Sequence, residues 1–408
     1  MKREDLAKPA QQASDGRARM LLLSHRGGLL SEGVQARLAV PAAQLGRAVA
    51  QHFAGNAGTV ADAMLVGALP FDRSAPAHLL APRLVRDADQ AAAWLQCTAS
   101  QAPAPEGWSL QAEPVRAGYV TAVATAVQRL QTASSCSMGL HKVVLARTLR
   151  ARSSTPISPW WLARRLAGDP GVLRYVLPLP GTDAPADAAP AWLVGATPEL
   201  LLSRRGAAIA SEPLAGSAAR GPDLAASEAR AQALRGSAKD QGEHRYVVQA
   251  IADLLAPLCR QLRVPATPAL HATASMWHLG TRIEGELKDA SPDGLPLASS
   301  AALAALLHPT PAVCGTPRAA AAQVIAELEP VPRGFYAGAV GWCDAAGDGD
   351  WHVALRCAHV QGHEARLFAG AGIVADSEPA LEAAETRAKF NAMLHALGIP
   401  PALFPQDR

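Results

Sequence analysis

Five charged residues stand in strand-like apolar runs or in helical segments where their chemistry could support catalysis. In chain order they are Lys142, Glu199, Glu243, Arg356 and Glu385. A lysine can act as a base, a glutamic acid can donate a proton, and an arginine can bind an anion. The two remaining carboxylates are ligands that a hard cation prefers. Because an isolated charge is costly to bury, such residues in a sheet interior would need partners or ligands; otherwise they would face outward.

Two predicted helices each present carboxylates on one face. Glu382, Glu385 and Lys389 follow i, i+3 and i+7 spacing in "EAAETRAKF", so they lie on one side of a helix. In "KDQGEH", Asp240 and Glu243 are again near neighbours. Together the two faces could hold Mg²⁺, which prefers oxygen ligands and keeps waters that a substrate can displace. Spacing alone equally allows two solvated faces with salt bridges inside each helix.

The segment "LFAGAGIVADS" places two glycines, Gly370 and Gly372, shortly before the second helix. A phosphate loop needs several glycines before a helix N-terminus, with Lys-Ser/Thr or a GxGxxG pattern. An apolar pair follows these glycines instead, so the segment predicts a strand and not a nucleotide site. His278 and His308 lie in other Gly/Pro-punctuated segments; either could be a ligand or a hydrogen-bonded structural residue.

The elements that would position these residues form a mixed pattern. Apolar runs flank turns at Arg205-Gly206 and at 361–364, which predicts two hairpins and antiparallel sheet. Helical spacing of apolar residues precedes Pro257, which ends or kinks that helix. Further helices are predicted over 301–307, 317–328 and 378–396. The predicted fold class is α+β, with a large antiparallel β-sheet core and helices packed outside.

Composition limits the class of protein. The chain has 408 residues, of which 49% are hydrophobic, enough for one large or two ordinary domains. Lys and Arg number 38 against 35 Asp and Glu, a net charge of +3, which does not indicate nucleic acid or an anionic membrane. We therefore expect a small-molecule ligand. Six cysteines without CxxC spacing, a polar N-terminus and no long apolar run predict a cytoplasmic protein with reduced thiols.

Ten segments of the chain occur in an order that resembles a known family. They are "HKVVLAR", "GATPELLL", "PLAGSAAR", "KDQGEH", "WHLGT", "LLHPTPAVCGTP", "ELEPVPRGFYAGAVGW", "ALRCA", "FAGAGIV" and "EAAETRAKF". Together they resemble the motifs of the chorismate-utilising enzymes, most of all the isochorismate synthases of siderophore and dihydroxybenzoate pathways. The resemblance is dense over 135–397. It implies a single chorismate-binding domain over 20–408 with the anthranilate synthase component I-like fold, after the flexible tail that the polar residues 1–19 predict.

The resemblance also implies roles for the charged residues. Water attacks ring carbon 2 of chorismate while the hydroxyl leaves carbon 4, so a base and an acid must face opposite sides of the ring. Lys142 resembles the base, and Glu199 resembles the acid, a role that needs a raised pKa. Glu243 and Glu385 resemble the ligands of a required Mg²⁺, with Glu382 and Asp240 as candidates for holding coordinated waters.

The other residues implied by the resemblance bind substrate. Arg356, Lys389 and the backbone amides near Gly370 resemble the site for the enolpyruvyl carboxylate. Gly216 and Ser217 would contact substrate where a side chain larger than serine would not fit. The substrate-binding set is Gly216, Ser217, His278, Ala312, Tyr336, Arg356, Gly370 and Lys389.

Four positions bear on which reaction of the family is implied. Ala215 stands where aminodeoxychorismate synthases carry a nucleophilic lysine, and Lys142 indicates water as the nucleophile. The resemblance therefore implies no amidotransferase subunit, and it implies a monomer because most simple relatives act as monomers. Ala312 stands where salicylate synthases tend to carry a hydroxylated residue, which favours isochorismate as the product. Tyr336 leaves a salicylate synthase open as the alternative, and a non-catalytic chorismate-binding paralogue is a further one.

Overall fold

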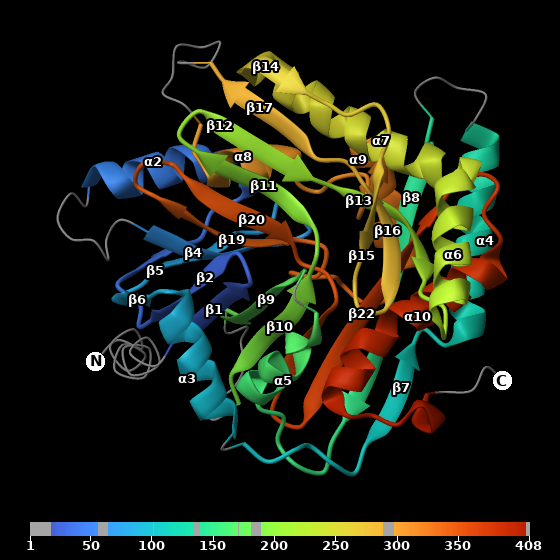
Figure 1. The fold of residues 1–408 in the computed structure, drawn as a ribbon, viewed down its shortest axis with the longest axis horizontal. Coiled ribbons are helices and arrows are strands. Elements are labelled where there is room, and N and C mark those ends of the chain that lie inside the picture. Colours follow the sequence, from blue (N-terminus) through green and yellow to red (C-terminus); the bar gives the residue numbers. More distant parts are fainter. Residues whose placement is uncertain are drawn as a thin grey trace, which may run out of the picture.

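The computed structural model describes residues 18–55, 64–100, 102–133, 139–169, 171–180, 189–288 and 298–404. Antiparallel sheets form the interior of the molecule and helices lie around them (Figure 1). This arrangement confirms the predicted α+β class. Most of the predicted N-terminal tail, residues 1–17, lies outside the described residues, and Arg19 already begins the first strand.

The largest sheet of the described residues has ten strands, paired antiparallel throughout. In spatial order they are β18 (Gly315–Thr316), β8 (Lys142–Arg152), β22 (Glu364–Ile373), β21 (Cys357–Gln361), β10 (Ala191–Thr197), β9 (Leu173–Pro178), β1 (Arg19–Ser24), β2 (Gly27–Glu32) and β6 (Leu84–Arg86), with β7 (Ser109–Glu113) also pairing with β8. The sheet therefore joins strands from both ends of the chain.

Two further sheets complete the interior. The nine-stranded sheet has the order β14 (Cys259–Arg263), β17 (Ile283–Leu287), β12 (Ala208–Glu212), β11 (Leu200–Arg205), β20 (Gly349–Val353), β19 (Ala339–Asp344), β4 (Met64–Leu69), β5 (His78–Ala81) and β3 (Ala36–Leu38). The three-stranded sheet has the order β13 (Leu214–Ala219), β16 (Met276–Gly280) and β15 (Ala269–Ala272). Both predicted hairpins are confirmed, as β11–β12 and β21–β22.

The helices lie outside the sheets, as predicted. They are α2 (Leu45–Gly55), α3 (Ala88–Ser100), α4 (Arg116–Ala133), α5 (Pro159–Arg165), α6 (Leu224–Gly236), α7 (Ala238–Leu255), α8 (Ser300–Leu307), α9 (Arg318–Leu328) and α10 (Pro379–Leu397). The Ser237 side chain caps α7 by accepting from the Asp240 amide, and Gly398 ends α10 with a φ of +71°, a conformation that favours glycine. Helices α8, α9 and α10 confirm the predictions over 301–307, 317–328 and 378–396 within one residue at each end.

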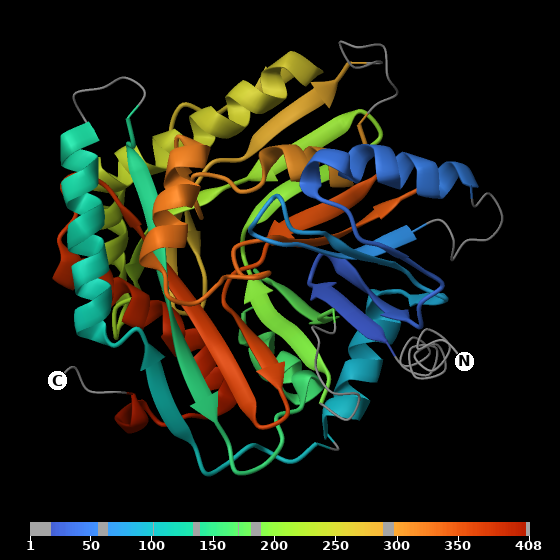
Figure 2. The ribbon, with the colours of Figure 1, turned by 180° about the vertical axis from the view of Figure 1, so that it is seen from behind.

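Buried side chains form layers between these elements. Leu22 and Leu193 of the ten-stranded sheet share a core with Leu69 and Trp351 of the nine-stranded sheet. A second core lies beneath α3, α5 and α10. On the reverse side, α4 and α9 cover β8 (Figure 2). Helix α10 packs against β22, which holds the predicted glycine pair next to the predicted metal carboxylates.

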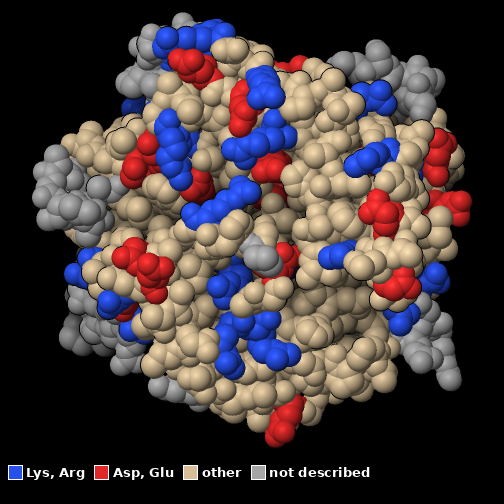
Figure 3. All heavy atoms as spheres, in the orientation of Figure 1, with Lys and Arg blue, Asp and Glu red and all other residues tan. Residues whose placement is uncertain are grey.

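Charge distribution, helix composition and cysteine state were predicted from the sequence and can be compared with the structure. Basic and acidic side chains are interspersed over the face that Figure 1 presents (Figure 3). Among the described helices, none has both the length and the apolar composition needed to cross a membrane. The described cysteines, which include Cys97 and Cys314, are free thiols.

Candidate active site

A cavity lies where the three-stranded sheet meets β8 and β22 and helices α7 and α10. Its empty volume is about 830 Å³, counting space open to solvent at the mouth. All of the predicted site residues line it except Lys142 and Glu382. The fold therefore brings together residues that are separated by up to about 250 positions in the chain, from Val144 to Lys389.

Glu199 and Arg356 lie in two adjacent short segments, called crossings here, where the chain passes from one large sheet to the other. Glu199 lies between β10 and β11, and Arg356 lies between β20 and β21. The sequence patterns placed both residues inside strand-like runs, and this expectation was wrong: each strand run is broken where the chain changes sheets. The crossings bond to each other, since the Val353 amide donates to the Glu199 carbonyl (3.1 Å) and the Ala196 amide donates to the Arg356 carbonyl (3.2 Å). Both side chains reach the cavity.

Glu199 is a buried carboxyl group in the cavity wall, and its burial raises its pKa. Its side chain is 3% exposed, and burial raises its pKa to about 8 against the opposing effects of the Leu214 amide, Lys142 and Lys389. A carboxyl group with this pKa is mostly protonated at pH 7. The direction of the shift is the one that the predicted acid needs.

Lys142 lies directly behind the cavity wall. It begins β8, is fully buried, and places its Nζ 2.8 Å from Oε1 of Glu243. Burial on its own would raise the pKa of Glu243, but Lys142, Lys389 and Lys239 together outweigh burial and the pKa is lowered. Gly372 makes the approach possible, because a Cβ there would lie 2.1 Å from the same Oε1. The predicted base and one predicted metal carboxylate thus form a buried ion pair.

The polar face of α10 points toward the cavity and toward α7. Lys389 Nζ lies 2.7 Å from Oε1 of Glu385, which also accepts from the Ser217 hydroxyl at 3.1 Å. Glu382 is 1% exposed, and its carboxylate lies 2.6 Å from Nζ of Lys239 on α7. The Lys389–Glu385 pair is the intrahelical salt bridge that the alternative of a solvated helix face predicts. The contacts with Ser217 and Lys239 show instead that this face of α10 packs against β13 and α7.

The carboxylates of α7 and α10 fit a hard divalent cation. Burial, with the nearby charges of Glu243 and Glu385, raises the pKa of Asp240; burial, with Glu385, likewise raises the pKa of Glu382. Burial is the larger cause of both shifts and neighbouring carboxylates add to it, so a bound cation would favour the charged forms of these side chains. No three His, Cys, Asp or Glu side chains of the described ranges are already gathered as a metal cluster. Mg²⁺ needs only one or two carboxylates beside waters and substrate oxygens, and Glu243 and Glu385 provide two.

Arg356 lies beside Glu199 and forms a cationic site together with the neutral side chain of His278. Nη2 of Arg356 is 2.5 Å from Nε2 of His278, and burial lowers the pKa of His278 well below its ordinary value. His278 is therefore neutral and accepts this bond. Burial lowers the pKa of Arg356 only to about 10, so the guanidinium stays charged and can bind a carboxylate. His308 is buried away from the cavity against the Pro70 carbonyl (2.9 Å), which confirms the structural alternative for it.

Close packing shapes the remaining walls. Gly216 has a φ of +79°, and a Cβ there would lie 3.0 Å from Cβ of Asp240. A Cβ on Gly370 would lie 3.1 Å from the Tyr336 hydroxyl, and the Tyr336 ring stacks on Phe368 with centroids 4.8 Å apart. The sequence analysis missed the apolar lining, which is Val144, Pro198, Leu214, Val313, Leu355, Phe368 and Ala369. Their types match those of ordinary core residues, so the sequence contains no signal that marks them.

The fold and the site define a cavity suited to a small anion, lined by a carboxyl group with a raised pKa and by two cationic side chains, with a buried lysine behind its wall. The model of the family "Chorismate binding enzyme" matches residues 61–398. The chain belongs to this family.

Solved and curated relatives agree with this assignment. The isochorismate synthase DhbC of Bacillus subtilis is 41% identical over 82% of this chain and 81% of its own. The structure of MenF, the menaquinone-specific isochorismate synthase of Escherichia coli, is 25% identical with a TM-score of 0.75, covering 95% of this chain and 90% of that one. Anthranilate synthase component I of Streptococcus pneumoniae is 19% identical with a TM-score of 0.65, over 92% and 89% of the two chains. The last comparison confirms the predicted fold.

Proposed function

We propose that this protein is an isochorismate synthase, which converts chorismate to isochorismate. The observation that supports it most strongly is the cavity that brings Glu199, with its raised pKa, and Glu243 together with the cationic groups Arg356 and Lys389, while Lys142 pairs with Glu243 from behind the wall. The relatives DhbC and MenF are isochorismate synthases, which indicates the reaction, and the cavity contains acidic, basic and cationic groups suited to it. All residues that the reaction would require are present, which disfavours a non-catalytic paralogue.

In the proposed reaction Lys142 acts as the base that takes a proton from the water that attacks ring carbon 2. Glu199 gives its proton to the hydroxyl that leaves carbon 4, so one water enters and one leaves. Arg356 and Lys389 bind the enolpyruvyl carboxylate and fix the ring between base and acid. Mg²⁺ held by Glu243 and Glu385 would supply electrostatic binding of the ring carboxylate.

Purified protein incubated with chorismate and Mg²⁺ tests this proposal. We expect isochorismate as the released product, separated by chromatography, with little salicylate fluorescence. Strong salicylate fluorescence without an added lyase would instead identify a salicylate synthase, the alternative that Tyr336 in the cavity wall leaves open. Absence of any product from chorismate would contradict both enzymes.

The raised pKa of Glu199 gives a prediction for the pH dependence. Because the acid must be protonated, kcat/KM should fall as the pH rises through about 8, by about tenfold per pH unit above it. Glu199→Gln keeps the shape of the side chain but cannot donate this proton, so its residual rate should lack the alkaline decline. A wild-type kcat/KM that stays level up to pH 10 would contradict the assignment of the acid.

The proposal includes a cytoplasmic monomer that needs no nucleic acid, membrane or amidotransferase subunit. The small net charge and the interspersed surface charges (Figure 3) support the absence of a polyanionic partner. Light scattering on the purified protein should give the mass of one 42.3 kDa chain, and twice that mass would contradict the monomer.

A further inference from the structure

Strand β8, which begins with Lys142, has an interrupted edge beside the cavity. On the edge opposite β22, β18 pairs with Lys142 and Val143, and β7 pairs with residues 148–152. Between these two partners, residues 144–147 have no strand on that edge among the described strands. Backbone groups of a buried strand still require hydrogen-bond partners.

A buried side-chain pair takes the place of the missing strand. The Ala146 amide donates to Oε1 of Glu329 (2.7 Å), and the Val144 carbonyl accepts from Nη2 of Arg333 (2.7 Å). Glu329 and Arg333 also bond to each other, with Nε to Oε2 at 2.8 Å and Nη2 to Oε1 at 2.5 Å. Both side chains are almost fully buried, so these bonds form without competing water.

The same arginine also reaches the neighbouring wall of the cavity, in the segment before β18, where the Cys314 carbonyl accepts from the Val144 amide at 2.8 Å. Its Nη1 donates to the Val313 carbonyl at 2.6 Å, and Val313 and the neighbouring Ala312 both line the cavity. The Arg333 carbonyl accepts from the Tyr336 amide at 3.0 Å, and the guanidinium lies 4.3 Å from the centre of the Phe71 ring. One side chain therefore links the base strand, at Val144, to the wall at Val313.

We propose that Arg333 and Glu329 are positioning residues, which set the distance between the strand of Lys142 and the cavity wall formed by Ala312, Val313 and Tyr336. This inference rests on the proposed function. Neither side chain lines the cavity, so the pair acts through the backbone groups that it holds. The planar guanidinium bonds two carbonyls and a carboxylate at once, a geometry that a lysine ammonium cannot reproduce.

Arg333→Lys and Glu329→Gln test the proposal by steady-state kinetics with chorismate. We expect kcat to fall at least about tenfold, since small misplacements of reacting groups are costly, while KM stays within about threefold because Arg356 and Lys389 are untouched. Wild-type turnover in the same assay tests the proposed function separately. If the wild type does not turn over chorismate, the proposed function fails. If the wild type turns over chorismate and both variants have the same kcat as the wild type, this inference fails.

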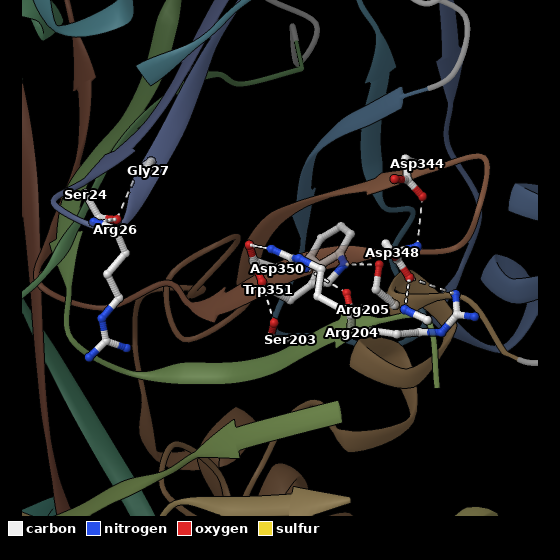
Figure 4. Close-up of polar contacts among 12 residues, drawn as sticks. Ser24, Arg26, Gly27, Ser203, Arg204, Arg205, Asp344, Asp348, Asp350 and Trp351 are labelled. Atoms are coloured by element: carbon white, nitrogen blue, oxygen red, sulfur yellow. Dashed lines mark hydrogen bonds and ion pairs between the residues drawn. The ribbon is translucent and has the colours of Figure 1, made fainter. Parts of the chain in front are cut away.

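Arg204 offers a matched control. It is a buried arginine at 3% exposure that donates to the Ala346 carbonyl at 2.9 Å and lies 3.8 Å from Asp348, in the polar cluster around the β19–β20 turn (Figure 4). Arg204→Lys should lower the melting temperature as Arg333→Lys does, without changing kcat. Equal losses of stability with wild-type kcat in Arg333→Lys and Glu329→Gln would overturn the proposal. Failure of both of these variants to fold would also overturn it, because the pair would then serve the whole core and not one wall.

Discussion

Replacing Lys142 with methionine is expected to lower the turnover of chorismate at least about a hundredfold, the range that removal of a general base covers. The change removes the proposed base but none of the groups that bind the substrate anions. Chorismate should therefore still bind, and the loss should appear in kcat more than in KM. Product formation followed by chromatography, with binding measured by calorimetry in the presence of Mg²⁺, checks both parts.

The structure adds a condition to this experiment. Lys142→Met leaves the buried carboxylate of Glu243 without its ion-pair partner, and such a charge destabilises a fold, so folding must be verified by circular dichroism. Lys288→Met is the control: this lysine contacts the Pro257 carbonyl at 2.7 Å in an exposed region and should leave turnover unchanged. A folded Lys142→Met variant with wild-type turnover would refute the role of Lys142.

Removal of Mg²⁺ is the second large effect that we expect. Excess chelator should abolish isochorismate formation, and added Mg²⁺ should restore it. Glu385→Gln should have a similar effect, because an amide keeps the contact with Ser217 but gives the cation a neutral ligand in place of a carboxylate. Calorimetric titration of Mg²⁺ into this variant should show weaker binding than in the wild type, so the test does not depend on activity alone.

A second acidic residue near the start of α10 provides the control. Glu378 precedes the helix as its N-cap residue and is exposed, so Glu378→Gln should bind Mg²⁺ and turn over chorismate like the wild type. Full activity in excess chelator would contradict the magnesium proposal outright. Unchanged Mg²⁺ affinity in Glu385→Gln would exclude Glu385 as a ligand while leaving the metal requirement itself in place.

Several features could be read from the sequence because they depend on local chemistry. The glycine turn at Gly206 and the apolar runs beside it predicted a hairpin, and the i, i+3, i+7 spacing placed Glu382, Glu385 and Lys389 on one helix face. These patterns arise from the periods of helix and strand, which neighbouring residues set. The fold class and the order of motifs followed from the same short-range information.

Only the tertiary structure decided how these pieces meet. Glu199 and Arg356 leave their strands at crossings between sheets, and Lys142 is paired with Glu243 from a helix about a hundred positions away. The raised pKa of Glu199 and the bridge from Arg333 to Val144 and Val313 depend on burial by distant segments. The sequence shows which side chains can titrate or donate a hydrogen bond. Strand pairing between distant segments then determines how deeply each side chain is buried and which partners it has, and these set its pKa and its chemical role.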